Sequence, residues 1–141
     1  GHSVINPNGP KCFCGKKGCV STYISGTGLE EMIYKSLKIK MSAKDFLNKE
    51  NYSKKENNIL NKFYEYFGLA LANIINTIDP DVIVLGGGLS NHKSLYTKGL
   101  KIIYKNIFCD EPDTPILQNK LGDSAGVIGA ALIGDKTNNI I

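Results

Sequence analysis

Apolar side chains recur every three or four residues along several stretches of the chain, which is the spacing of an amphipathic helix. The most regular stretch follows Ser53, a residue type favoured at helix N-caps, and its apolar positions are Leu60, Phe63, Phe67, Leu71, Ile74 and Ile78. Asp79-Pro80 prevents its continuation, because proline lacks the N–H and restricts the residue before it. The pattern predicts a long helix that ends near residue 78.

The same spacing predicts four shorter helices, at residues 27–39, 42–47, 95–108 and 125–133. The first follows a break at Ser25-Gly26, and Ser42 can cap the second. Asp123 or Ser124 can cap the last, so Asp123 is interpreted as a cap rather than as a catalytic acid. The small residues of that last helix would allow close packing against a neighbour.

An apolar run of a different kind, Val82-Ile83-Val84-Leu85, lies between Pro80 and three glycines. Its β-branched residues predict a buried strand, and residues 114–117 predict a second extended segment. A buried strand needs partners for its backbone N–H and C=O groups, and the chain has only two or three credible strands. We therefore expect a helix-rich α/β unit that is part of a larger protein or that borrows strands from another copy.

The composition is that of a soluble globular protein of one domain. The 141 residues are 42% hydrophobic and 21% charged, and no apolar run approaches the roughly 20 residues of a membrane-spanning helix. The start of the sequence lacks the basic and then apolar layout of a secretory signal. A cytoplasmic protein with no membrane partner is the resulting prediction.

The charge pattern argues against nucleic-acid binding by this unit. All 17 basic side chains are lysines, the formal net charge is only +4, and the lysines are scattered among 13 acidic residues. A nucleic-acid surface normally needs a concentrated basic patch, and the guanidinium groups that read base edges are absent.

Three of the four cysteines cluster near the start, at Cys12, Cys14 and Cys19, and His2 precedes them. Three thiolates and one imidazole form a complete tetrahedral ligand set for structural zinc. Reduced free thiols are the main alternative, and a disulfide is less favoured because three clustered cysteines cannot pair evenly. We call residues 1–20 the Cys/His loop.

The strand at residues 82–85 runs into Gly86, Gly87 and Gly88, which we call the glycine turn. Glycines after a strand allow backbone amides to approach a phosphate or an adenosine, although a plain turn explains them equally well. No catalytic residue emerges from the sequence. His2 is assigned to the cysteine cluster, and His92, in a polar stretch, is predicted to be a surface residue.

Three segments together resemble the ROK family of bacterial sugar kinases and sugar-responsive repressors. In the first, Gly1-His2 and Pro7-x-Gly9 precede Cys-x-Cys-Gly-x-x-Gly-Cys at residues 12–19, and Tyr23-x-Ser25-Gly26 follows. The second runs from Ile75 through Asp79-Pro80 to the glycine turn, and the third, at residues 122–131, is rich in glycine and alanine. The matches span the chain in the family's order.

The resemblance implies a ribonuclease-H-like, actin-like α/β fold of two lobes. This chain, residues 1–141, would be the C-terminal part of the second lobe, incomplete, with the Cys/His loop at residues 1–20 and mostly helices at 21–141. The catalytic aspartate would lie upstream, so this part alone would be inactive. Zinc, Mg-ATP, a sugar, the upstream part of the protein and a second copy in a homodimer are the implied cofactors and partners.

The resemblance also implies roles for individual residues. His2 and the position two residues after Cys19 would contact the sugar, and Gly86, Gly87 and Gly88 would contact the nucleotide. Ser21 stands where the family usually has glutamate. Because a charged acceptor is lost there, the choice of sugar is open.

The implied activity is transfer of phosphate from ATP to glucose, fructose or N-acetylmannosamine. Two alternatives stay open. One is the sugar-sensing domain of a ROK-type repressor, in which a separate upstream domain would bind nucleic acid. The other is a small zinc-stabilised interaction module with no sugar role.

Overall fold

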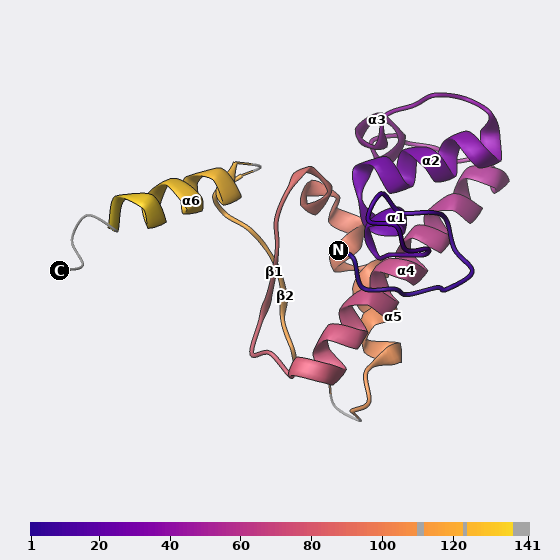
Figure 1. Cartoon of the computed structure of the whole chain (residues 1–141). Coiled ribbons are helices and arrows are strands. Elements are labelled where there is room, and N and C mark those ends of the chain that lie inside the picture. Colours follow the sequence, from indigo (N-terminus) through magenta and orange to yellow (C-terminus); the bar gives the residue numbers. More distant parts are fainter. Residues whose placement is uncertain (110–111, 123, 137–141) are drawn as a thin grey trace.

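The computed structural model describes residues 1–109, 112–122 and 124–136, which form a helical body, a short sheet and a projecting last helix (Figure 1). The α-helices are α1 (Ser21–Ile24), α2 (Gly26–Leu37), α3 (Ala43–Leu47), α4 (Lys54–Ile78), α5 (Lys98–Asn106) and α6 (Ala125–Lys136). The strands are β1 (Ile83–Leu85) and β2 (Ile116–Gln118), and two 3₁₀ turns are η1 (Gly88–Asn91) and η2 (Lys93–Tyr96). Asp123, the predicted cap, lies outside the described residues.

The long helix α4 begins and ends as the sequence predicts. The Ser53 hydroxyl accepts a hydrogen bond from the Glu56 N–H, and the Glu56 carboxylate accepts one from the Ser53 N–H, which completes a capping box. At the other end Asp79 adopts φ 49°, and its N–H bonds to the Ile75 carbonyl. This left-handed residue stops the helix one position before Pro80.

The shorter helices differ from prediction mainly at their ends. Helix α2 stops at Leu37 rather than Ile39, because Lys38 turns left-handed at φ 60°. Ser42 caps α3 by accepting the Asp45 N–H. The predicted helix at residues 95–108 is interrupted at Thr97, so that η2 precedes a shorter α5.

The core forms around the apolar face of α4, with α1, α2 and α5 packed against it (Figure 1). Glycines allow α4 and α5 to approach closely. A Cβ added to Gly68 of α4 would lie 2.4 Å from the Ile102 side chain, and one added to Gly99 of α5 would lie 2.8 Å from the Phe67 ring. The largest fully buried side chains are Phe46, Phe63, Leu29, Ile33 and Ile103.

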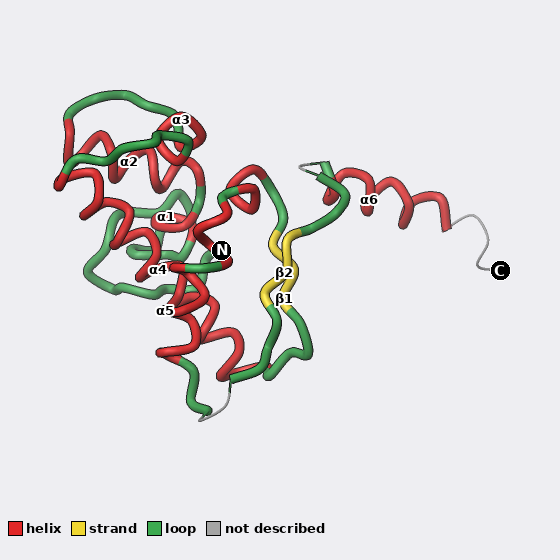
Figure 2. The backbone as a smooth tube through the Cα atoms, turned by 180° about the vertical axis from the view of Figure 1, so that it is seen from behind, coloured by secondary structure: helices red, strands yellow, loops and turns green. Residues whose placement is uncertain are grey.

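The two strands are parallel, with Ile83 opposite Ile116, and α5 lies on the crossover between them. The prediction of a buried strand is wrong, since Val84 is 58% exposed and Leu117 is 51% exposed. In the described part of the chain no layer covers this face, and α6 extends away from the helical body (Figure 2). Its apolar Val127 is therefore exposed as well.

None of the helices in the described ranges combines the length and the apolar character needed to cross a bilayer.

A buried ion pair gives a first test of this fold. Lys49 contacts the Glu56 carboxylate and, together with the Ser53 N–H, lowers the Glu56 pKa to about 2. Since the folded pKa lies below the ordinary value, the pair stabilises the chain fully above about pH 4.5, and the effect is lost as pH falls towards 2.

We expect Glu56→Gln, which keeps the cap but removes the charge, to lower the free energy of unfolding at pH 7 by on the order of 1 kcal/mol. The difference from wild type should shrink below pH 4.5 in urea titrations. Glu31→Gln removes a solvent-exposed pair with Lys35 and serves as the control, with a smaller loss. A Glu56→Gln deficit that persists unchanged at pH 2 would contradict the assignment.

Candidate functional site

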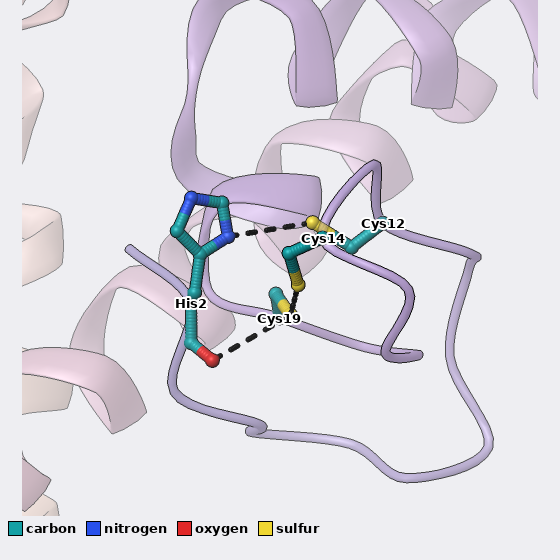
Figure 3. A group of neighbouring side chains, drawn as sticks. All are labelled: His2, Cys12, Cys14 and Cys19. Atoms are coloured by element: carbon teal, nitrogen blue, oxygen red, sulfur yellow. Dashed lines mark hydrogen bonds between the residues drawn. The ribbon is translucent and has the colours of Figure 1, made fainter.

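Four side chains of the Cys/His loop converge on one point (Figure 3). The ligand atoms of His2, Cys12, Cys14 and Cys19 all lie within 4.8 Å of one another. The Cys12 sulfur is 3.5 Å from His2 Nδ1, and the sulfurs of Cys14 and Cys19 are 3.6 Å apart. All four cysteines of the described chain, including the distant Cys109, are free thiols.

The separations of 3.5 and 3.6 Å fit a tetrahedral metal. Zinc–sulfur bonds of about 2.3 Å and zinc–nitrogen bonds of about 2.0–2.1 Å place neighbouring ligand atoms roughly 3.5–3.8 Å apart. The donor set of three sulfurs and one imidazole nitrogen is the one that zinc prefers, and it leaves no open position for a reacting water. The loop can therefore hold a closed, structural zinc ion.

Local backbone geometry brings the ligands together. Gly18 has φ +64°, and a Cβ there would lie 1.6 Å from the Asn6 carbonyl oxygen, so only glycine fits. Its own carbonyl accepts the N–H groups of Ile5 and Asn6. This crossing holds the two arms of the loop side by side and leaves Cys19 buried beneath His2.

The thiols of the cluster differ in acidity. The Cys14 backbone N–H, with smaller contributions from the Cys14 thiol, His2 and Ser21, lowers the Cys12 pKa to about 6. Burial, followed by the neighbouring sulfurs, raises the Cys19 pKa to about 11. Cys12 is therefore already a thiolate at neutral pH, whereas Cys19 needs the charge of a metal ion to lose its proton.

The structure also places Ser21 at this cluster. Its hydroxyl oxygen lies 3.9 Å from the Cys12 sulfur, so Ser21 and His2 both contact the same thiol. The second ring nitrogen of His2, Nε2, points away from the sulfurs (Figure 3) and is available to another ligand. The arrangement agrees with the sugar-contacting roles predicted for His2 and Ser21 without testing them.

A network that the sequence analysis did not find attaches the loop to the core. The Asn6 side-chain amide donates to the hydroxyls of Tyr23 and Tyr66, at 3.1 and 3.2 Å. The two tyrosine rings stack with centroids 3.7 Å apart. Tyr66 lies on α4, so the network connects the loop to the longest helix; its only sequence signal is the tyrosine content of that helix.

The glycine turn is open to solvent. No atom lies within 4 Å of where a Cβ of Gly86 or Gly87 would stand, and Gly87 has φ +79°, which favours glycine. The Ser90 N–H and hydroxyl both donate to the Gly87 carbonyl, so the turn is held in shape while its outer face stays free. A ligand could approach the backbone here without obstruction.

A cavity of about 640 Å³ adjoins this turn, within the size range of small-ligand sites. One wall comes from the start of α2 and from α3, and the other from the glycine turn, η1 and η2. The lining residues are Gly26, Ala43, Lys44, Leu47, Asn48, Gly88, Leu89, Asn91, His92, Lys93 and Ser94. The cavity thus joins the glycine turn to the segment that follows the Cys/His loop.

His92 is not the free surface residue that the sequence analysis predicted. Its ring is half-buried, and its Nε2 lies 2.7 Å from the Tyr64 hydroxyl. Burial, with a smaller effect from Lys98, lowers the His92 pKa. The error arose because Tyr64 is 28 residues away in sequence, and only the tertiary fold brings His92, between η1 and η2, to this side chain of α4.

Comparison with known proteins finds relatives similar in sequence and in structure. A sequence model of the ROK family matches residues 1–137. An N-acetyl-D-glucosamine kinase of Mannheimia succiniciproducens is 40% identical over 124 residues, which is 86% of this chain and 40% of that enzyme. The chain therefore spans less than half the length of the curated relatives that it matches.

Solved structures show the same fold. A ROK hexokinase from Thermus thermophilus superposes with a TM-score of 0.80 at 29% identity, over 94% of this chain and 46% of the hexokinase. A Streptomyces griseus ROK glucokinase bound to glucose and AMPPNP superposes with a TM-score of 0.77 at 21% identity, over 94% of this chain and 49% of the glucokinase. A ROK transcriptional regulator, described as a homolog of an E. coli protein, superposes with a TM-score of 0.75 at 24% identity, over 96% of this chain and 37% of the regulator. Kinases and a regulator share this helix-rich α/β fold.

The ligand geometry can be tested by metal analysis. Protein purified without added zinc is expected to hold about one zinc per chain, because the loop has few apolar residues to stabilise it otherwise. Cys14→Ala should reduce the zinc content several-fold, whereas Cys109→Ala, the matched control outside the cluster, should leave it unchanged. Substoichiometric zinc together with freely reactive Cys12, Cys14 and Cys19 would exclude the site.

Proposed function

The chain belongs to the ROK family, and from this premise we propose that it is the C-terminal part of an ATP-dependent sugar kinase. N-acetyl-D-glucosamine is the acceptor best supported, since the curated relatives carry that activity. This similarity is the observation that carries the proposal. Glucose, fructose and N-acetylmannosamine are the other acceptors to be compared, and a cytoplasmic location and a homodimer complete the proposal.

The geometry supports two ligand sites within this part of the enzyme. The sugar would lie against the Cys/His loop, where His2 Nε2 and the Ser21 hydroxyl can form hydrogen bonds. The nucleotide would enter the cavity beside the glycine turn, with the open backbone at Gly86, Gly87 and Gly88 close to its phosphates. Lys44 and Lys93 at the same cavity supply positive charge for an anionic ligand.

The reaction would follow the ordinary course of phosphoryl transfer. A sugar hydroxyl gives its proton to a general base while its oxygen bonds to the γ-phosphorus, and the bond from that phosphorus to the β,γ-bridging oxygen breaks to release ADP. Mg²⁺ on the phosphates supplies charge neutralisation. The family resemblance implies that the base is an aspartate upstream of this chain, so the residues described here bind and orient the substrates.

The Cys/His loop would hold the His2 ring in the orientation that binds the sugar. With zinc bound at Nδ1, the His2 ring would be fixed in both tautomer and orientation, and Nε2 would carry the proton and could donate it to a sugar oxygen. Zinc, when bound, supplies the crosslink that keeps this arrangement. The loop otherwise relies on the backbone crossing at Gly18 and on the Asn6 amide.

A sugar-sensing regulator is the second candidate function, favoured by the fold shared with the ROK transcriptional regulator. Such a protein would keep the sugar site but carry a separate DNA-binding unit. The upstream sequence discriminates between the two: an aspartate-containing catalytic loop favours the kinase, and a helix-turn-helix favours the regulator.

The central test is an ADP-release assay on the full-length protein that contains this chain. We expect ADP release that depends on N-acetyl-D-glucosamine, and only background from residues 1–141 alone, because the base would lie upstream. Background turnover by the full-length protein with every sugar would contradict the kinase proposal. Sugar-dependent turnover by residues 1–141 alone would show that the base lies within them.

Substitution at position 21 tests the sugar site separately. Restoring the family's carboxylate with Ser21→Glu is expected to lower the KM for sugar about tenfold, since a charged acceptor strengthens one hydrogen bond by about 1.5 kcal/mol. The KM for ATP should stay within twofold, because the nucleotide cavity does not include this residue. An unchanged KM for sugar would mean that position 21 does not face it.

A further inference from the structure

His92 is held in one orientation by the core. Its Nε2 lies 2.7 Å from the hydroxyl of Tyr64, and the planes of the two rings differ by only 8°. Tyr64 is 3% exposed and lies on α4, so its position is set by packing on both sides of that helix. The half-buried His92, which lies between η1 and η2, is thereby held by a core residue.

The hydrogen bond to Tyr64 bears on which ring nitrogen carries the proton. Burial raises the Tyr64 pKa and lowers that of His92, which favours a protonated phenol and a neutral imidazole. In the arrangement in which the Tyr64 O–H donates to Nε2, the imidazole proton sits on Nδ1. No protein group within the described ranges forms a hydrogen bond with Nδ1.

His92 also lines the cavity beside the glycine turn. Apolar side chains from both walls, Ala43, Leu47 and Leu89, also line this cavity. These apolar side chains can pack against a flat heterocycle, and a donor fixed beside them can meet an acceptor nitrogen on its edge.

We propose that His92 is the residue that selects the nucleobase, with its Nδ1–H donating to an unprotonated ring nitrogen of adenine and with Tyr64 as its positioning residue. This inference rests on the proposed function, because it assigns the nucleotide to this cavity. Adenine offers an acceptor at N1, where guanine carries a hydrogen. A fixed donor at that point therefore favours ATP and leaves GTP with two opposed donors.

Two variants of the full-length protein distinguish the roles of the two ring nitrogens of His92. The amide nitrogen of His92→Asn can replace Nδ1 but cannot reach Tyr64, whereas the amide oxygen of His92→Gln can accept from Tyr64 but leaves no donor at Nδ1. We expect His92→Gln to raise the KM for ATP about tenfold and to reduce the preference for ATP over GTP by a similar factor. His92→Asn should retain most of both properties, and the KM for sugar should change in neither variant.

Thermal unfolding of both variants shows whether each is folded at the assay temperature. An ATP preference that is unchanged in His92→Gln, or lost equally in His92→Asn and His92→Gln, would overturn the inference, because the ring would then serve only to pair with Tyr64. Absence of sugar-dependent ATP turnover in the wild type would overturn the proposed function and this inference with it. The two failures are distinct, since the first requires an active wild type.

Discussion

Burial of one face of α4 is the interaction on which the rest of the molecule depends. The helix supplies Phe63 and Phe67 to the core, and α1, α2 and α5 all pack against it. Between these core positions it also supplies Tyr64 and Tyr66, whose hydroxyls reach His92 and Asn6 respectively. A single rigid element thus positions both the cavity beside the glycine turn and the Cys/His loop, and an error in its packing would displace both.

The two regions are held together by different means. The cavity wall that contains His92 is held by the burial of the neighbouring Ser90 and by the hydrogen bond between His92 and Tyr64 of the core. The Cys/His loop has little apolar surface of its own, and its shape depends on a backbone crossing at Gly18 and on a ligand set suited to zinc. Metal removal should therefore affect the Cys/His loop before it affects the helical body.

The exposed sheet shows where this unit needs a neighbour. Parallel strands are normally covered on both faces, yet Val84, Leu117 and the apolar side chains of α6 are exposed here. The sequence pattern of β1 is typical of a buried strand, and it predicted burial wrongly because no covering layer is present among the described residues. The chain spans less than half the length of its curated relatives. The residues are those of a buried strand, but the layer that would cover them is not among the described residues.

The sequence by itself determined the features set by local chemistry. Helical spacing and the caps at Ser42, Ser53 and Asp79 placed the helices, and the spacing of His2 and the three cysteines identified the ligand set, because each depends on residues near in sequence. Only the tertiary structure decided the rest. His92 meets Tyr64 across 28 residues and Asn6 meets Tyr66 across 60, and no local pattern encodes such pairs, because their contact is set by how the helices pack.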